Sequence, residues 1–96
     1  MIVTDEAREE LLAAAIWYDD QRAGLGDEFL SDVDEVLERV AEAPLSYPRD
    51  RFDERARRAL LARFPFAVVF VVHADDVRVV AFAHAKRLPA YWTKRV

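Results

Sequence analysis

The chain has 96 residues, and its 14 basic and 18 acidic side chains leave a net charge of −4. This length suits one hydrophobic core, because a second core would need roughly another 100 residues, so we expect a single domain over residues 1–96. The hydrophobic share of 53% favours a folded chain over a disordered one. The chain has no cysteine, which excludes disulfides, a thiolate nucleophile and cysteine-based metal sites.

The first half of the chain predicts two helices. Ile2 and Val3 form a very short β-like start, and Thr4 is a suitable N-cap for a helix whose first turn is acidic. Apolar residues then recur with the period of one buried helix face, at Ala7, Leu11, Ala14, Ala15 and Tyr18. Glycines at 24 and 26 interrupt this pattern, which predicts a helical hairpin. A second apolar stripe extends toward Pro44 and contains Phe29, Val33, Val36, Leu37 and Val40.

The second half predicts strands. After a connection at 45–55, segments 57–64, 66–73 and 77–84 are rich in Val, Phe and Leu, which is typical of three antiparallel strands in a meander. The expected fold class is α+β, with an N-terminal helical hairpin packed on a three- to four-stranded antiparallel sheet. If Asp75 and Asp76 form a two-residue turn, His73 would lie opposite Arg78.

One face of this sheet lacks a predicted cover. Segments 66–72 and 79–83 are apolar at both sets of alternating positions, whereas two helices form a single layer. The second face would be covered either by a partner protein or by the tail, which contains Leu88, Tyr91 and Trp92. The sequence leaves both alternatives open.

Charge divides between the two halves. Residues 1–50 carry four basic and 14 acidic side chains, a net of −10, and residues 51–96 carry ten and four, a net of +6. Cations and aromatic rings bind RNA, and His84, Lys86, Arg87 and Tyr91 are suitable residue types for a metal-free ribonuclease. The alternative is structural, because basic residues also protect sheet edges and aromatic tails pack. The basic set is Arg55, Arg57, Arg58, Arg63, Arg78, His84, Lys86, Arg87, Lys94 and Arg95.

Several other classes of site are not expected. The only two glycines, at 24 and 26, provide no phosphate-binding loop, and the only two histidines, His73 and His84, lie on different predicted strands. We therefore expect no metal site and no cofactor. The N-terminus is acidic where a signal peptide is basic, and the longest apolar run, 64–72, is far below the roughly 20 residues of a membrane span. These features predict a cytoplasmic protein without membrane contact.

Three segments, in order, resemble the RelE/ParE superfamily of toxins from bacterial type II toxin–antitoxin modules, which includes plasmid stabilisation proteins. They are AIWYDDQRAGLGDEFL at 15–30, Arg-Phe-Pro-Phe at 63–66 and the ending His-x-Lys-Arg-x-Pro-x-Tyr-Trp at 84–92. The likeness extends from Glu6 to Trp92 and implies a helical hairpin packed on an antiparallel sheet. Members usually have a longer first strand, so we expect that strand to be truncated here or the true start to lie upstream.

The resemblance implies one of two activities. RelE-like members cut messenger RNA on the ribosome, and the corresponding catalytic residues here would be Arg58 (or Arg57), Arg63, His84, Arg87 and Tyr91. ParE-like members are associated with inhibition of DNA gyrase. The chain is closer to ParE, because region 33–40 is acidic, no lysine precedes Lys86, and the negative net charge disfavours approach to polyanionic RNA. We expect a gyrase inhibitor that is not an enzyme, with the metal-independent endoribonuclease and a non-toxic, antitoxin-binding protein as alternatives.

The resemblance also implies where partners bind. The expected contact with gyrase lies in the last strand and the tail, at His84, Lys86, Arg87, Tyr91 and Trp92. A cognate antitoxin would neutralise the toxin in a hetero-oligomer, by wrapping its C-terminal segment around the toxin as a helix or strand. We expect this segment over a groove between the helical hairpin and the sheet, at Trp17, Phe29 and Phe82.

Overall fold

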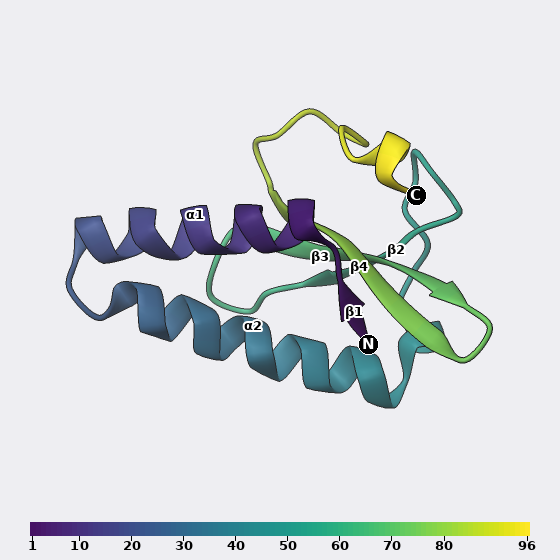
Figure 1. The fold of residues 1–96 in the computed structure, drawn as a ribbon, viewed down its shortest axis with the longest axis horizontal. Coiled ribbons are helices and arrows are strands. Elements are labelled where there is room, and N and C mark those ends of the chain that lie inside the picture. Colours follow the sequence, from purple (N-terminus) through teal and green to yellow (C-terminus); the bar gives the residue numbers. More distant parts are fainter.

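The computed structural model describes residues 1–96, and in it two helices pack on one face of a four-stranded sheet (Figure 1). The elements in chain order are β1 (Ile2–Val3), α1 (Asp5–Gln21), α2 (Leu25–Glu42), β2 (Arg57–Leu60), β3 (Phe66–His73) and β4 (Asp76–His84). Two short 3-10 turns follow α2 and end the chain, at Pro44–Ser46 and Thr93–Arg95. The expected α+β fold with an N-terminal helical hairpin is therefore confirmed.

Local sequence signals position the two helices. The Thr4 hydroxyl accepts a hydrogen bond from the Ala7 N–H at 3.2 Å, so it caps α1 as expected. Gly24, with φ of 91°, supplies the left-handed residue between the helices. Gly26 is buried where α2 crosses α1, and a Cβ at this position would lie 2.5 Å from the Ala15 carbonyl oxygen. The absence of a side chain at Gly26 thus allows the two helices to approach closely.

The sheet has the strand order β1-β4-β3-β2. Strands β2, β3 and β4 form the expected antiparallel meander. Strand β1 pairs in parallel with β4, through Ile2 opposite Arg78 and Val3 opposite Val79, so the sheet is mixed rather than wholly antiparallel. A two-residue segment is too short for its sequence to reveal whether it pairs in parallel or antiparallel. The direction of β1 is set by the point at which the chain leaves the sheet to begin α1.

The β3–β4 hairpin turns one residue earlier than the sequence predicts. Ala74 and Asp75 form the turn, and His73 pairs with Asp76 rather than with Arg78. Ala74 has φ of 53°, in the left-handed region that tight hairpin turns require. The predicted register was wrong because both faces of these strands are apolar, and alternation then does not specify the pairing.

The helices cover one sheet face and the tail covers the other. The first core contains 13 buried residues from both helices and the sheet, including Phe29, Phe70 and Phe82. On the opposite face the Trp92 side chain, only 1% exposed, packs among Ala56, Val69, Val80, Ala81 and Ala83. The sequence left open whether a partner protein or the tail covers the second face, and in the structure the tail covers it.

Gly26→Ala should destabilise the protein by about 1–3 kcal/mol, the usual cost of forcing an extra methyl group into a packed interface. The added Cβ meets backbone, which cannot rotate away. Chemical denaturation measures the change, and Ser31→Ala, at an exposed position of α2, is the control. Equal stability of the two variants would show that the helices do not approach this closely.

Candidate functional site

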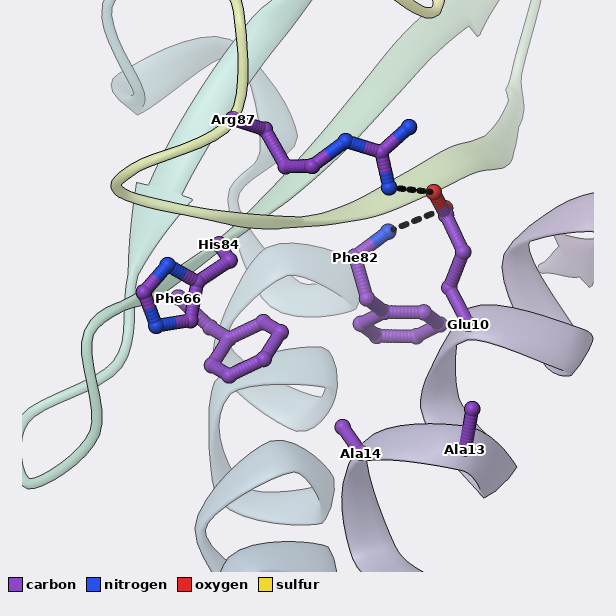
Figure 2. Close-up of a pocket in the computed structure, with 7 residues that line it drawn as sticks. All are labelled: Glu10, Ala13, Ala14, Phe66, Phe82, His84 and Arg87. Atoms are coloured by element: carbon purple, nitrogen blue, oxygen red, sulfur yellow. Dashed lines mark hydrogen bonds and ion pairs between the residues drawn. The ribbon is translucent and has the colours of Figure 1, made fainter. Parts of the chain in front are cut away.

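A groove of about 300 Å³ lies between α1 and the end of β4. Helix α1 contributes Glu10, Ala13 and Ala14, and the sheet and the following loop contribute Phe66, Phe82, His84 and Arg87. In Figure 2 the rings of Phe66 and Phe82 lie toward the two alanines of α1, and the Glu10 carboxylate and Arg87 close one end. The groove is thus apolar along its length and charged at one end.

Glu10 joins three segments of the chain. Its Oε1 accepts hydrogen bonds from the Phe82 N–H on β4, at 3.2 Å, and from the Arg95 guanidinium, at 2.9 Å. Its Oε2 accepts from the Tyr91 hydroxyl at 2.6 Å and forms an ion pair with Arg87 at 3.8 Å. The dashed lines in Figure 2 mark the contacts with Phe82 and Arg87. This one carboxylate therefore ties α1 to the edge of β4 and to the tail.

Two cations lie close to the Tyr91 ring. The Arg87 Cζ lies 3.8 Å from the ring centroid and the Arg95 Cζ lies 5.2 Å from it. Burial, reinforced by the hydrogen bond to Glu10 and its negative charge, raises the pKa of Tyr91 well above its ordinary value of 10.0. Tyr91 therefore keeps its proton at neutral pH and uses it to bond Glu10, which opposes a role as a general base.

The arginines expected for RNA cleavage are paired with carboxylates at separate places. Arg58 on β2 contacts the buried Asp50 at 3.2 Å, and Arg63, after β2, contacts Glu28 on α2 at 3.5 Å. His84, at the end of β4, accepts a hydrogen bond from the Lys86 N–H through Nδ1, at 3.0 Å. Four of the five residues proposed as catalytic, Arg58, His84, Arg87 and Tyr91, line one hollow beside the tail, and Arg63 does not.

The expected partner-binding residues differ in accessibility. Lys86 and Arg87 are exposed, as a target contact requires, whereas Trp92 is buried under the sheet and has no free surface. Of the expected antitoxin contacts, Trp17 is 59% exposed, whereas Phe82 borders the groove but is only 2% exposed. Phe29 is fully buried in the first core, so its side chain offers no surface to a partner in this structure.

The groove continues past Trp17. A second hollow of about 190 Å³, lined by Ala14, Trp17, Tyr18, Phe66 and His84, shares three of these residues with the first.

Neither helix is long and apolar enough to cross a membrane. No group of three or more histidine, aspartate or glutamate side chains is arranged to hold a metal ion, and His73 and His84 lie at opposite ends of their hairpin.

No protein-family model and no curated protein matches this chain. Among solved structures it is similar to a chain of the chromosomal ParDE toxin–antitoxin system from P. aeruginosa, with a TM-score of 0.67 and 21% sequence identity. The match covers 90% of this chain and 97% of that one. The chain therefore has a ParE-like fold, as the sequence resemblance implied.

Sequence analysis missed the residues that fix the tail. The predicted apolar stripe of the first helix does not include Glu10, although Glu10 lies three residues after the buried Ala7 and four before Ala14, at the border of the buried face. Asp53 is the second such residue: it binds Arg55 at 2.6 Å and accepts a hydrogen bond from the Thr93 hydroxyl. These bonds hold the pKa of Asp53 well below its ordinary value of 3.8.

Glu10→Gln should lower the free energy of unfolding by about 1–3 kcal/mol, because hydrogen bonds to a charged, mostly buried carboxylate are lost. Denaturant titration measures this change. Fluorescence of Trp92 in a Trp17→Phe background should also report a looser tail. Glu9→Gln, at the exposed neighbouring position, serves as the control and should stay within about 0.5 kcal/mol. Equal effects of the two substitutions would contradict the role assigned to Glu10.

Tyr91 should make stability depend on alkaline pH. Since its folded pKa is raised, its contribution is fully present below the ordinary value of 10.0 and is lost as pH rises above it. The stability difference between the wild-type chain and Tyr91→Phe, from denaturant titrations, should be constant from pH 7 to 9.5 and then fall. Tyr18, whose pKa burial also raises, is present in both proteins and cancels. A difference that grows with alkaline pH would contradict the placement of the phenol.

Proposed function

We propose that this chain is the toxin of a type II toxin–antitoxin pair, which stops bacterial growth by binding DNA gyrase and is neutralised by a cognate antitoxin. The observation that carries the proposal is the ParE-like fold, which matches a chain of a ParDE toxin–antitoxin system over nearly its whole length. Fold alone does not select the target, so the choice of gyrase rests on the charges of the site.

The pairing of the arginines supports inhibition by contact over RNA cleavage. Arg58, Arg63 and Arg87 each form an ion pair with a carboxylate, which competes with a phosphate group for the guanidinium. The Tyr91 hydroxyl donates its proton to Glu10 and is thus engaged. The proposed target contact is the surface formed by the exposed Lys86 and Arg87 and the half-buried His84.

The proposed antitoxin site is the groove between α1 and the sheet. Its wall contains Phe66 and Phe82, and Trp17 borders its continuation. An amphipathic segment that lays its apolar side into this groove would cover the half-buried Phe66 ring and the exposed Trp17 ring. The cytoplasm is the compartment in which both the antitoxin and gyrase would be met.

The test is pulse-labelling of DNA and protein synthesis in bacteria directly after induction of this chain alone. The proposal predicts early arrest of DNA synthesis with altered plasmid supercoiling, and relief when the neighbouring small gene is co-expressed. Early arrest of translation with cut messages would instead support the ribonuclease. Soluble accumulation without effect on either process would leave only the antitoxin-binding alternative.

Charge reversal at the proposed contact sharpens this test. Lys86→Glu should weaken growth inhibition, so that at least ten times more inducer is required for the same effect. The reason is that an exposed cation would become an anion at the interface. Arg51→Glu makes the same change at an exposed position outside the proposed contact and is the control. Equal loss of inhibition in both variants would point to net charge and argue against this surface.

A further inference from the structure

One corner of the second sheet face lies beyond the reach of the tail. A hollow of about 200 Å³ is found there, at the end of β2, and no residue after Ala85 lines it. Its lining includes Ala67 and Ala83, which are paired neighbours on β3 and β4. Leu60 on β2 borders the hollow, and its side chain is 72% exposed. The fold thus leaves an apolar depression beside an exposed leucine.

The edge of β2 beside this hollow has backbone groups without a strand partner. The Leu61 N–H bonds the Phe66 carbonyl at 3.0 Å, so the N–H and C=O of Leu60 point away from β3, because direction alternates along an antiparallel strand. The segment before β2 covers only the start of the edge, where the Arg58 N–H bonds the Pro48 carbonyl at 3.1 Å. Proline has no N–H, so Pro48 returns no bond to the Arg58 carbonyl. The Arg58 C=O and both backbone groups of Leu60 therefore face an open edge.

The segments that border the hollow present positive charge. Residues 56–67 and 83–88 carry five basic side chains and no acidic one, and the adjoining loop 48–55 carries three of each sign. The helices contribute three carboxylates that contact these segments, from Glu10, Glu28 and Asp32. Five cations against three carboxylates leave a net charge of +2, and Glu10 and Asp32 are mostly buried. A ligand with acidic groups is therefore favoured at this surface.

A second copy of the chain and an RNA strand each match only part of this surface. Two copies joined edge to edge through β2 would bring together the arginines at 57, 58 and 63 of both chains, which opposes association. RNA would match the charge, but it has no backbone that continues a β-sheet. An extended protein segment matches all three features, because it pairs with a strand edge, buries Leu60 and carries carboxylates.

We propose that the end of β2 and this hollow bind an extended segment of a partner protein, which adds to the sheet as a short strand and carries acidic residues beside an apolar one. The apolar side chain would lie in the hollow against Leu60 and Ala67. The carboxylates would meet Arg63 and Lys86, whose chain neighbours Phe64 and Ala85 line the hollow.

The hollow is continuous with the proposed target contact. Arg58, Ala83 and Ala85 line it and also line the hollow beside the tail, to which His84 and Arg87 belong. The bound segment therefore belongs to the target of the toxin, whereas the groove proposed for the antitoxin lies between α1 and the sheet. In naming the target the assignment rests on the proposed function, but the addition of a strand to β2 does not.

The experiment is selection of a displayed library of short unstructured peptides against the intact chain. The expected result is enrichment of peptides in which aspartate or glutamate flanks an apolar residue. Affinity of a selected peptide should fall at least tenfold for Leu60→Pro, which removes the free N–H, and less for Leu60→Gln, which keeps it. Leu12→Gln changes a leucine that is 52% exposed on α1, and as the matched control it should leave affinity unchanged.

Chemical modification of the peptide tests strand pairing on the wild-type chain. N-methyl groups at every second residue should abolish binding in one register and be tolerated in the other, because only alternate N–H groups face β2. Leu60→Pro removes no hydrogen bond to β3, so its unfolding midpoint should stay near the wild-type value, and this is measured first. If that variant fails to fold, the N-methylated peptides decide the question alone.

Several outcomes would overturn the proposal. They are absence of enrichment, enrichment of basic peptides, and binding that ignores both Leu60→Pro and N-methylation. A dimer seen by light scattering that Leu60→Pro dissolves would assign the edge to a second copy, and displacement of the peptide by a short single-stranded RNA would assign it to RNA. None of these measurements involves bacterial growth, so their failure is distinguishable from failure of the proposed toxin activity.

Discussion

The position of the C-terminal tail depends on the Glu10 carboxylate. The tail has no strand of its own, and its 3-10 turn contributes only a few backbone hydrogen bonds. Glu10 provides the charged contacts, to Tyr91 and Arg95, and in the same place it satisfies the Phe82 N–H at the edge of β4. A residue of α1 thus sets how the tail lies against the sheet, and through the tail it keeps Trp92 on the second sheet face.

Part of the uneven charge of the sequence is paired inside the molecule. Glu10, Glu28 and Asp50 come from the acidic half of the chain, and their partners Arg87, Arg95, Arg63 and Arg58 come from the basic half. These pairs join the hairpin and its following loop to the sheet and tail. The uneven charge therefore serves the fold as well as the binding of partners. The charges outside ion pairs remain for partners, and they include Glu9 and Asp20 on α1 and Lys86 in the tail.

Helix and strand periods predicted the hairpin and the meander because the buried stripes at Phe29 to Val40 and Phe66 to His73 are unambiguous. The register was not predictable from pattern, since Val80 and Ala81 pack on the tail side while Val79 and Phe82 pack on the hairpin side. For the same reason an apolar pattern does not distinguish an interface residue from a core residue. The sequence predicts partner contacts at Phe29 and Trp92, which are core residues. It makes no such prediction for Leu12 and Ile16, which are exposed.

Contact, rather than catalysis, is the activity that this arrangement favours physically. A catalyst of RNA cleavage needs cations free to meet the developing phosphorane charge and a base without a prior proton partner. Here Arg87 lies against Tyr91 and forms an ion pair with Glu10, which competes with a phosphate for the guanidinium. The proposed contact at Lys86 would leave these bonds intact.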